Sequence, residues 1–216
     1  MKGLLLKDIL IIRNQGKSLL LIFFMGIMMS LTMQISSVIA YLTLLGGMLA
    51  MGTLSYDEAD RGYSFLFTLP ASRKTYVKEK YLFCLLFTAL CLLAGILSCL
   101  LLSLVKDGAS SISLDEIIST SCGMFFSVLL FLIIEIPLRL KYGLERSRIS
   151  LYIFAGVIAL IALLFTRILP EAVIDQIDFW FIHHVAIVGL TLIALILIGL
   201  YVSYRISIRI LLKKEF

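Results

Sequence analysis

Hydrophobic residues along the chain gather into six long runs, each close to the length that crosses a bilayer. The runs cover residues 18–35, 37–55, 81–105, 117–138, 149–169 and 184–204. A helix needs about 20 apolar residues to cross a hydrocarbon core of about 30 Å. Lipid cannot hydrogen-bond free backbone groups, and the runs are continuous rather than alternating, so we expect six transmembrane helices and not a β-barrel.

The stretch before the first run, residues 2–17, mixes charge with an apolar stripe. Leu5, Ile9 and Ile12 share one helical face, while Lys7 and Asp8 lie elsewhere on the helix. This pattern predicts a helix that lies in the membrane interface. The alternative is a plain extension of the first span beyond the membrane.

The segment between the second and third runs, residues 56–80, is too long and too patterned for a simple connector. Asp57 can cap a short helix, Pro70 would end it, and Ser72 can cap the next one. The residues that form one apolar face of that short helix are Ala59, Tyr63, Leu66 and Phe67. This face either packs on lipid and on the chain's own spans or docks onto a partner protein.

Composition agrees with a membrane protein. The 216 residues are 61% hydrophobic and 15% charged, whereas soluble domains are about 45–50% apolar and about 25% charged. We therefore expect an all-α integral membrane protein in which residues 1–216 form a single domain, with the lipid bilayer as its main environment.

Positive charge is distributed unevenly between the two sides of the membrane. Of the 19 Lys and Arg residues, all except Lys106 and Arg167 fall before the first span, in segments 56–80 and 139–148, or after the last span. Short loops rich in Lys and Arg stay in the cytoplasm. We therefore expect both termini and segment 56–80 to be cytoplasmic. This arrangement accounts for the net charge of +5 without a nucleic-acid partner.

Catalytic and metal-binding motifs are missing from the sequence. HExxH, GxSxG and GxxxxGK[ST] do not occur, and the four cysteines form no CxxC pair. His183 and His184 are adjacent, so on a helix they point in different directions. We expect no catalytic residue and no metal site, and therefore not an enzyme.

Glu135 is the one acid within a predicted span, and a carboxylate in a membrane is a functional candidate. Arg139 follows four residues later, in the order that favours an ion pair on a helix. Two interpretations stay open. Glu135 either pairs with Arg139 as a structural element or belongs to a substrate path or gate.

Small residues recur along the second span. Gly46 and Ala50 form a small-xxx-small pair, which allows two helix backbones to approach closely. The approaching helix can belong to the same subunit or to a second one.

Several stretches resemble a known class of membrane proteins. They are YDEADRGYSFLFTLPASRKTYVKEKYL from Tyr56, IPLRLKYGLERSR at residues 136–148, the opening MKGLLLKDIL, and the tail from Lys213 to Phe216. Together they are similar to small six-helix permease subunits of the type-2 exporter class of ABC transporters, including peptide and toxin exporters of bacteria.

This resemblance implies a fold, partners and a site. It implies six helices with both termini in the cytoplasm, and pairing with a second permease copy, identical or related. It also implies a separate ABC ATPase that binds ATP and Mg, so that this chain binds no cofactor itself. The loop between the second and third spans would carry a coupling helix that sits on the ATPase. By position, the resemblance nominates Asp57, Glu58, Arg61, Tyr63, Leu66, Phe67, Leu69, Pro70 and Arg73 as coupling residues.

The expected function is therefore that of a permease subunit of an ATP-driven exporter in the bacterial plasma membrane. Amphipathic peptides or other hydrophobic cargo suit its apolar spans. The alternative is a stand-alone secondary carrier or channel that uses Glu135. A membrane-embedded sensor or enzyme would need a polar catalytic cluster, for which the sequence offers no candidate.

Overall fold

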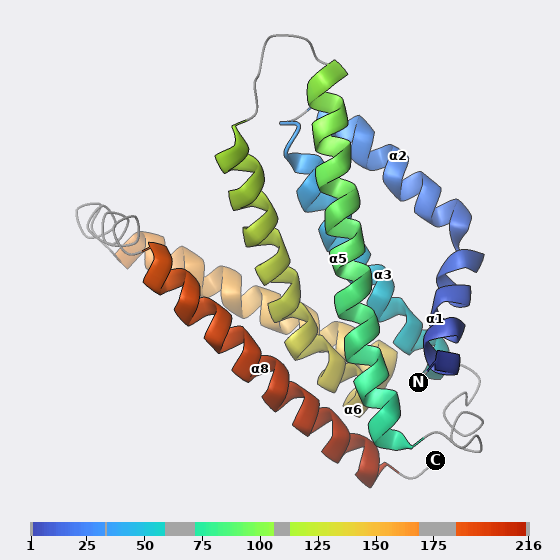
Figure 1. Ribbon diagram of the computed structural model, residues 1–216. Coiled ribbons are helices and arrows are strands. Elements are labelled where there is room, and N and C mark those ends of the chain that lie inside the picture. The colour runs from blue at the N-terminus through green and yellow to red at the C-terminus, as the bar shows by residue number, and fades with distance from the viewer. Residues whose placement is uncertain (1, 33, 59–71, 106–112, 169–184, 215–216) are drawn as a thin grey trace.

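The computed structural model describes residues 2–32, 34–58, 72–105, 113–168 and 185–214, and this part of the chain is all-helical (Figure 1). The helices are α1 (Lys2–Asn14), α2 (Gly16–Thr32), α3 (Ser37–Glu58), α5 (Arg73–Val105), α6 (Leu114–Ile168) and α8 (Val185–Lys213). The prediction of an all-α protein is confirmed. Each predicted apolar run overlaps a helix, and α6 contains the fourth and fifth runs.

Four helices in the described part are long and apolar enough to cross a membrane: α3, α5, α6 as far as Gly143, and α8 from Gly189. Helices α1 and α2 meet at a bend of 65°, and together they count as a fifth span if a broken span is accepted. Four or five spans are therefore candidates. The count of six and the cytoplasmic location of the termini stay predictions.

The helix boundaries change the picture of segment 56–80. The sequence predicts that Asp57 caps a new helix. This prediction is wrong, because α3 runs on to Glu58 and Asp57 lies within its last turn. Ser72 does cap α5, because its Oγ accepts a hydrogen bond from the backbone N–H of Thr75 at 3.1 Å. Both ends of the segment thus belong to long helices, and only its middle connects them.

Helix α1 buries a different stripe from the predicted one. Leu4, Asp8 and Ile12 face inward, whereas Ile9 is exposed. Local apolar spacing favoured Leu5, Ile9 and Ile12, but partners on other helices make Asp8 an interior residue. The bend after Asn14 means that α1 is not a straight extension of α2.

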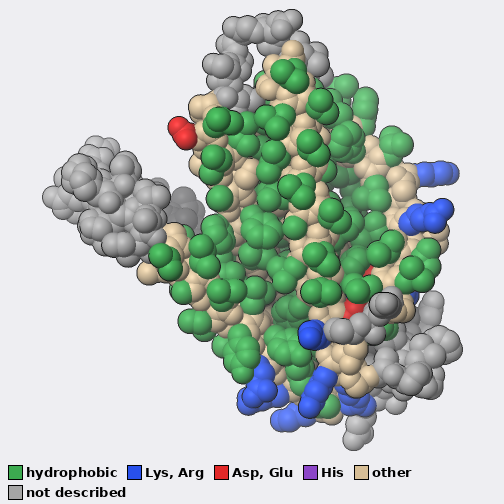
Figure 2. All heavy atoms as spheres, viewed as in Figure 1, with side chains coloured by type: hydrophobic (Ala, Val, Ile, Leu, Met, Phe, Trp, Pro, Cys, Tyr) green, Lys and Arg blue, Asp and Glu red, His purple; other side chains and the backbone are tan. Residues whose placement is uncertain are grey.

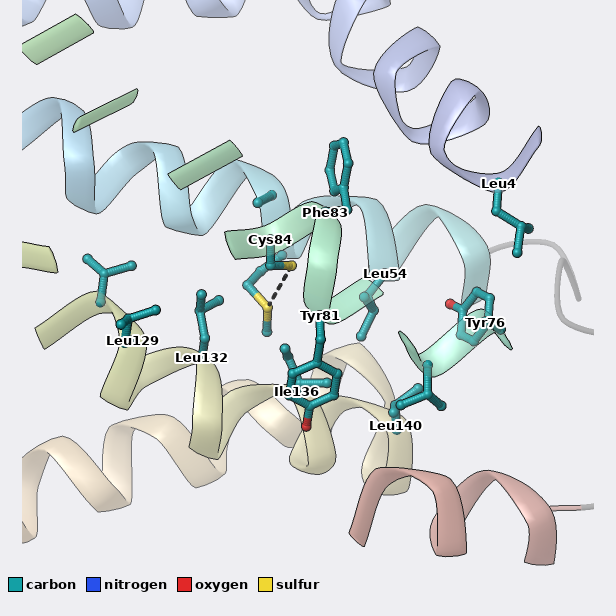
Figure 3. Close-up of a cluster of buried hydrophobic side chains, with 14 of the residues drawn as sticks. Leu4, Leu54, Tyr76, Tyr81, Phe83, Cys84, Leu129, Leu132, Ile136 and Leu140 are labelled. Atoms are coloured by element: carbon teal, nitrogen blue, oxygen red, sulfur yellow. Dashed lines mark hydrogen bonds between the residues drawn. The ribbon is translucent and has the colours of Figure 1, made fainter. Parts of the chain in front are cut away.

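A buried core joins five of the helices (Figure 3). Leu54 of α3, Tyr76 and Cys84 of α5, and Ile136 and Leu140 of α6 lie within it. Cys84 contacts the sulfur of a methionine on α3 and is a free thiol. The core therefore lies at the end of the bundle where α3 ends and α5 begins.

The pair of α3 and α5 forms the centre of the bundle because small residues let the two backbones approach. A Cβ at Gly46 would lie 2.5 Å from Cβ of Cys91 on α5, so only glycine fits there. Ala50 is fully buried in the core. In this chain, therefore, Gly46 and Ala50 pack within the subunit.

A smaller apolar cluster holds the opposite end of the bundle. It contains Ile35, Ile39, Cys99 and Ile117, from the start of α3, the end of α5 and the start of α6. A hydrogen bond of 2.8 Å from Ser36 Oγ to Glu116 is its polar contact. Burial of apolar side chains dominates this end.

The outer surface differs along the length of the molecule. Figure 2 shows apolar side chains over most of the visible face, with Lys and Arg side chains along the lower end and others on the right-hand edge above it. Exposed leucines such as Leu90 and Leu101 on α5 and Leu195 on α8 belong to this apolar surface. An exposed apolar surface of this extent is typical of a protein surface that contacts lipid tails instead of water.

Candidate functional site

A buried cluster of charged side chains joins α1 to the two ends of segment 56–80, which belong to α3 and α5. Lys80 of α5 is 1% exposed and lies between two carboxylates. Its Nζ is 2.5 Å from Asp8 Oδ2 on α1 and 2.7 Å from Asp57 Oδ2 on α3. Lys7 of α1 also pairs with both acids. One cation therefore links three helices that are distant in sequence.

Helical spacing explains how each element supplies its part of the cluster. Thr53 and Asp57 are one turn apart on α3, and Tyr76 and Lys80 are one turn apart on α5, so each pair lies on one face. The Tyr76 hydroxyl donates to Asp57 at 2.9 Å, and Lys80 donates to Thr53 at 3.2 Å. These hydrogen bonds offset part of the cost of burying charge.

Glu79 adds a third acid at the edge of this cluster. Its side chain is fully buried, and neither carboxylate oxygen has a hydrogen-bond partner within the described residues. With Asp8 and Asp57 it outnumbers the cations Lys7 and Lys80. A cluster with excess buried acid depends strongly on its two cations, because losing either would leave carboxylates uncompensated.

A second polar group braces α3 from the other side. Glu135 is fully buried and accepts a hydrogen bond of 2.5 Å from Arg139 Nε, one turn later on α6. The Arg139 guanidinium also donates to the backbone oxygen of Met51 at 2.9 Å and to Ser55 Oγ at 3.0 Å. The pair thus ties α6 to the last turns of α3. Oε2 of Glu135 has no hydrogen-bond partner in the described part.

Glu58, the last residue of α3, packs on a break in α6. Gly143 has a φ of 79°, which lies in the left-handed region that favours glycine. A Cβ at this position would meet the Glu58 carboxylate. The backbone conformation requires glycine, and the end of α3 lies against the point where α6 changes direction.

Helix α8 is fastened to the start of α5. The Arg73 guanidinium donates to the backbone oxygens of Leu211 at 2.9 Å, Leu212 at 3.1 Å and Lys214 at 3.2 Å. A cation at the carboxyl end of a helix also interacts favourably with its dipole. The first residue of α5 therefore anchors the end of α8.

One further contact joins α5 and α8 a little deeper. The Tyr81 hydroxyl lies 2.6 Å from Ser203 Oγ and 2.9 Å from Ser207 Oγ. Any movement of the start of α5 would therefore be felt in α1, α3 and α8.

The nominated coupling residues fall into two groups. Asp57, Glu58 and Arg73 are described, and each makes contacts inside the subunit. Because the Asp57 carboxylate is buried in the charge cluster, it is not exposed to a docking partner. The remaining nominated residues lie outside the described part of the chain: Arg61, Tyr63, Leu66, Phe67, Leu69 and Pro70.

Sequence reasoning missed most members of the charge cluster. In the sequence, Lys7 and Lys80 count only as positive charges outside the spans, and Asp8 lies off the apolar stripe of helix 2–17. A signal was present in Asp8, which interrupts the otherwise apolar stretches GLLL and ILII with only Lys7 beside it. A single acid among apolar residues is either exposed or paired, and periodicity alone favoured exposure.

No group of three or more His, Cys, Asp and Glu side chains within the described residues is arranged to hold a metal ion. The polar groups found there instead link helices to one another.

Comparison with known proteins identifies the family. The family model of ABC-2 family transporter proteins matches residues 3–211, nearly the whole chain. Searches among curated proteins and among solved structures gave no match. The match reaches every helix that the structure describes, and it includes the charge cluster and the segment between α3 and α5. The chain is therefore a member of the ABC-2 transporter family, a multi-pass membrane permease that is a transport component and not itself a catalyst.

Proposed function

We propose that the chain is the membrane-spanning permease subunit of an ATP-driven exporter, coupled through segment 56–80 to a separate ABC ATPase. ATP and Mg bind to the ATPase in this proposal, and both termini of the permease face the cytoplasm of a bacterium. The observation that carries it is the junction around Lys80. The two helices that flank the segment are joined by an ion pair to each other and to α1.

The junction gives the proposal a mechanism. The part of the segment between α3 and α5 starts after Glu58 and ends at Arg73, so a force on it would act on both helices at once. The Lys80 ion pairs with Asp8 and Asp57 would pass that movement to α1, and Arg73 would pass it to α8. Access to the substrate path would then switch between the two faces of the membrane.

Cargo and assembly are further parts of the proposal. Amphipathic peptides or other hydrophobic molecules suit a surface of leucine, methionine and phenylalanine with few exposed charges between the ends of the bundle. Two permease copies, identical or related, would enclose the path, since a single copy presents its apolar helices outward (Figure 2).

Co-purification in mild detergent with the products of neighbouring genes tests the coupling. Phe67→Asp places a charge on the predicted apolar face of the segment, and Ser64→Asp adds the same charge off that face. We expect the ATPase to co-purify with the wild type and with Ser64→Asp, and to be lost with Phe67→Asp. Absence of any ATPase from the wild-type complex, together with intact transport by Phe67→Asp, would refute the proposal.

A second candidate function is a stand-alone carrier that uses Glu135. The buried Oε2 of Glu135, which has no hydrogen-bond partner among the described residues, favours it. Burying a carboxylate in a membrane costs free energy, and residues of this kind mark substrate or ion paths. The ion pair with Arg139 argues for a structural role instead. Transport by proteoliposomes without nucleotide, abolished by Glu135→Gln, would support the carrier and exclude ATP coupling.

A further inference from the structure

An apolar groove of about 340 Å³ lies between α2, α3 and α5, away from the charge cluster. Leu20 and Phe23 of α2 form one wall, and Gly46 of α3 and Cys91 and Ala94 of α5 contribute to the rest. Its volume is at the lower end of the range for ligand sites, about 300–1,000 Å³. No side chain that lines it carries a charge, so the groove suits a hydrocarbon chain.

Small residues create the space in this groove. Gly46 has no side chain, and Ala94 and Cys91 have short ones, so α3 and α5 present a shallow floor. Helix α2 bends away from α1 by 65° at Gln15, which sets its leucine and phenylalanine side chains over that floor. The groove therefore results from the small residues on α3 and α5 and from the bend that precedes α2.

Two exposed cations flank the bend at one end of the groove. Arg13 lies in the last turn of α1, and Lys17 lies in the first turn of α2. Lys17 precedes the groove residue Leu20 by three positions, so both lie on one face of α2. A slot for hydrocarbon with two cations at its mouth is complementary to an amphiphile that has an anionic head.

The height of the bend also fits a lipid headgroup. Gln15 Nε2 donates to the Tyr56 hydroxyl at 2.7 Å, which sets the bend near the last turn of α3. The same turn carries Asp57 of the charge cluster, so the bend lies beside charged groups and not at the apolar end of the bundle. Basic side chains at that level attract anionic lipids.

We propose that this groove holds an acyl chain of an anionic phospholipid whose headgroup phosphate binds Arg13 and Lys17. The site would fasten α2 to α3 and α5 with lipid, independently of ATP coupling. The proposed occupant is therefore a membrane phospholipid. A second copy of the chain and an exported amphiphile are the competing occupants.

Native mass spectrometry of the purified protein, released from nanodiscs of phosphatidylcholine with a minor share of phosphatidylglycerol, tests the headgroup site. We expect phosphatidylglycerol to stay bound to the wild type. Arg13→Gln with Lys17→Gln should reduce retention about 30-fold, since each of the two cations near a membrane surface contributes about 1 kcal/mol. The matched control pair, Arg205→Gln with Arg209→Gln, removes two exposed cations of α8 and should leave retention unchanged.

Filling the groove tests the acyl-chain site separately. Ala94→Trp should displace the lipid, whereas Leu86→Trp, at an exposed position of α5 that does not line the groove, should not. Equal retention of phosphatidylcholine and phosphatidylglycerol, or equal losses in the two charge pairs, would overturn the proposal. Loss of a dimer signal by Ala94→Trp with lipid retention unchanged would assign the groove to a second copy and overturn it too. If Ala94→Trp does not fold, the charge pairs decide alone.

Discussion

The two ends of the α3–α5 pair are held together by different kinds of interaction. At one end Lys80, Asp8 and Asp57 form a buried ionic junction, and at the other end Ile35, Ile39 and Cys99 form an apolar cluster. An apolar contact loses little when helices slide, because one hydrocarbon neighbour replaces another. A buried ion pair has discrete partners and loses much when one of them leaves. The difference suggests that the ionic end moves as one body while the apolar end can adjust.

The largest expected effect comes from removing the central cation. Lys80→Met leaves two buried carboxylates without their main partner, which costs about 3–5 kcal/mol when a buried ion pair is broken. Lys78→Met, at an exposed position on the same turn of α5, should change stability by less than about 0.5 kcal/mol. The free energy of unfolding in mixed micelles measures both. Similar values for the two variants would show that the junction does not hold this end together.

The apolar end should respond to volume instead of charge. A Cβ at Gly95 would lie 3.0 Å from the Ile39 Cα, so Gly95→Val forces α3 and α5 apart at a cost of about 1–3 kcal/mol. Gly123→Val on α6 meets nothing within 4 Å and serves as the control. The same unfolding measurement applies. A neutral Gly95→Val would mean that the apolar end is looser than the structure indicates.

The Glu135–Arg139 ion pair on α6 should lose less stability when both charges are removed than the two single removals predict together. Glu135→Gln removes the charge that faces Arg139 and should cost about 1–3 kcal/mol. The double variant Glu135→Gln with Arg139→Met should cost less than the two single changes together, because neither charge is left alone. Strictly additive costs in this double-mutant cycle would exclude direct coupling.

The smallest effect is expected where a neutral hydrogen bond joins α5 to α8. Tyr81→Phe removes the hydroxyl that meets Ser203 and Ser207 and should cost about 1 kcal/mol. Tyr201→Phe, an exposed position on α8, should cost nothing measurable. Thermal unfolding of the two variants in the same detergent compares them. A larger loss for Tyr201→Phe than for Tyr81→Phe would contradict the assigned packing of α8.

Much of the fold could be predicted from the sequence because its signals are local. The apolar runs located the long helices, Ser72 marked the start of α5, and the spacing of Glu135 and Arg139 gave an i, i+4 contact. Only neighbouring residues are needed to recognise such features.

The ionic junction could not be predicted in this way, since its members are far apart along the chain. Asp8 and Lys80 are 72 positions apart, and Lys7 and Asp57 are 50 apart. Burial of Asp8 is favourable only once α5 brings Lys80 to it. Seen alone, the first 14 residues indicate an amphipathic surface helix with Asp8 exposed, and Gly16 is the local signal for the bend at Gln15. Tertiary contacts shifted the buried face of α1 from Leu5, Ile9 and Ile12 to Leu4, Asp8 and Ile12.

In the proposed mechanism, movement of the segment between α3 and α5 reaches α1 through the Lys80 ion pair with Asp8. Spin labels at Leu6 of α1 and Leu82 of α5, both exposed positions, would report the distance between these two helices in the permease–ATPase complex. We predict that a non-hydrolysable ATP analogue with Mg leaves this distance unchanged in the wild type and in Lys78→Met, because α1 moves together with α5, and changes it in Lys80→Met while the ATPase stays bound. An unchanged distance in a folded Lys80→Met complex would contradict the mechanism.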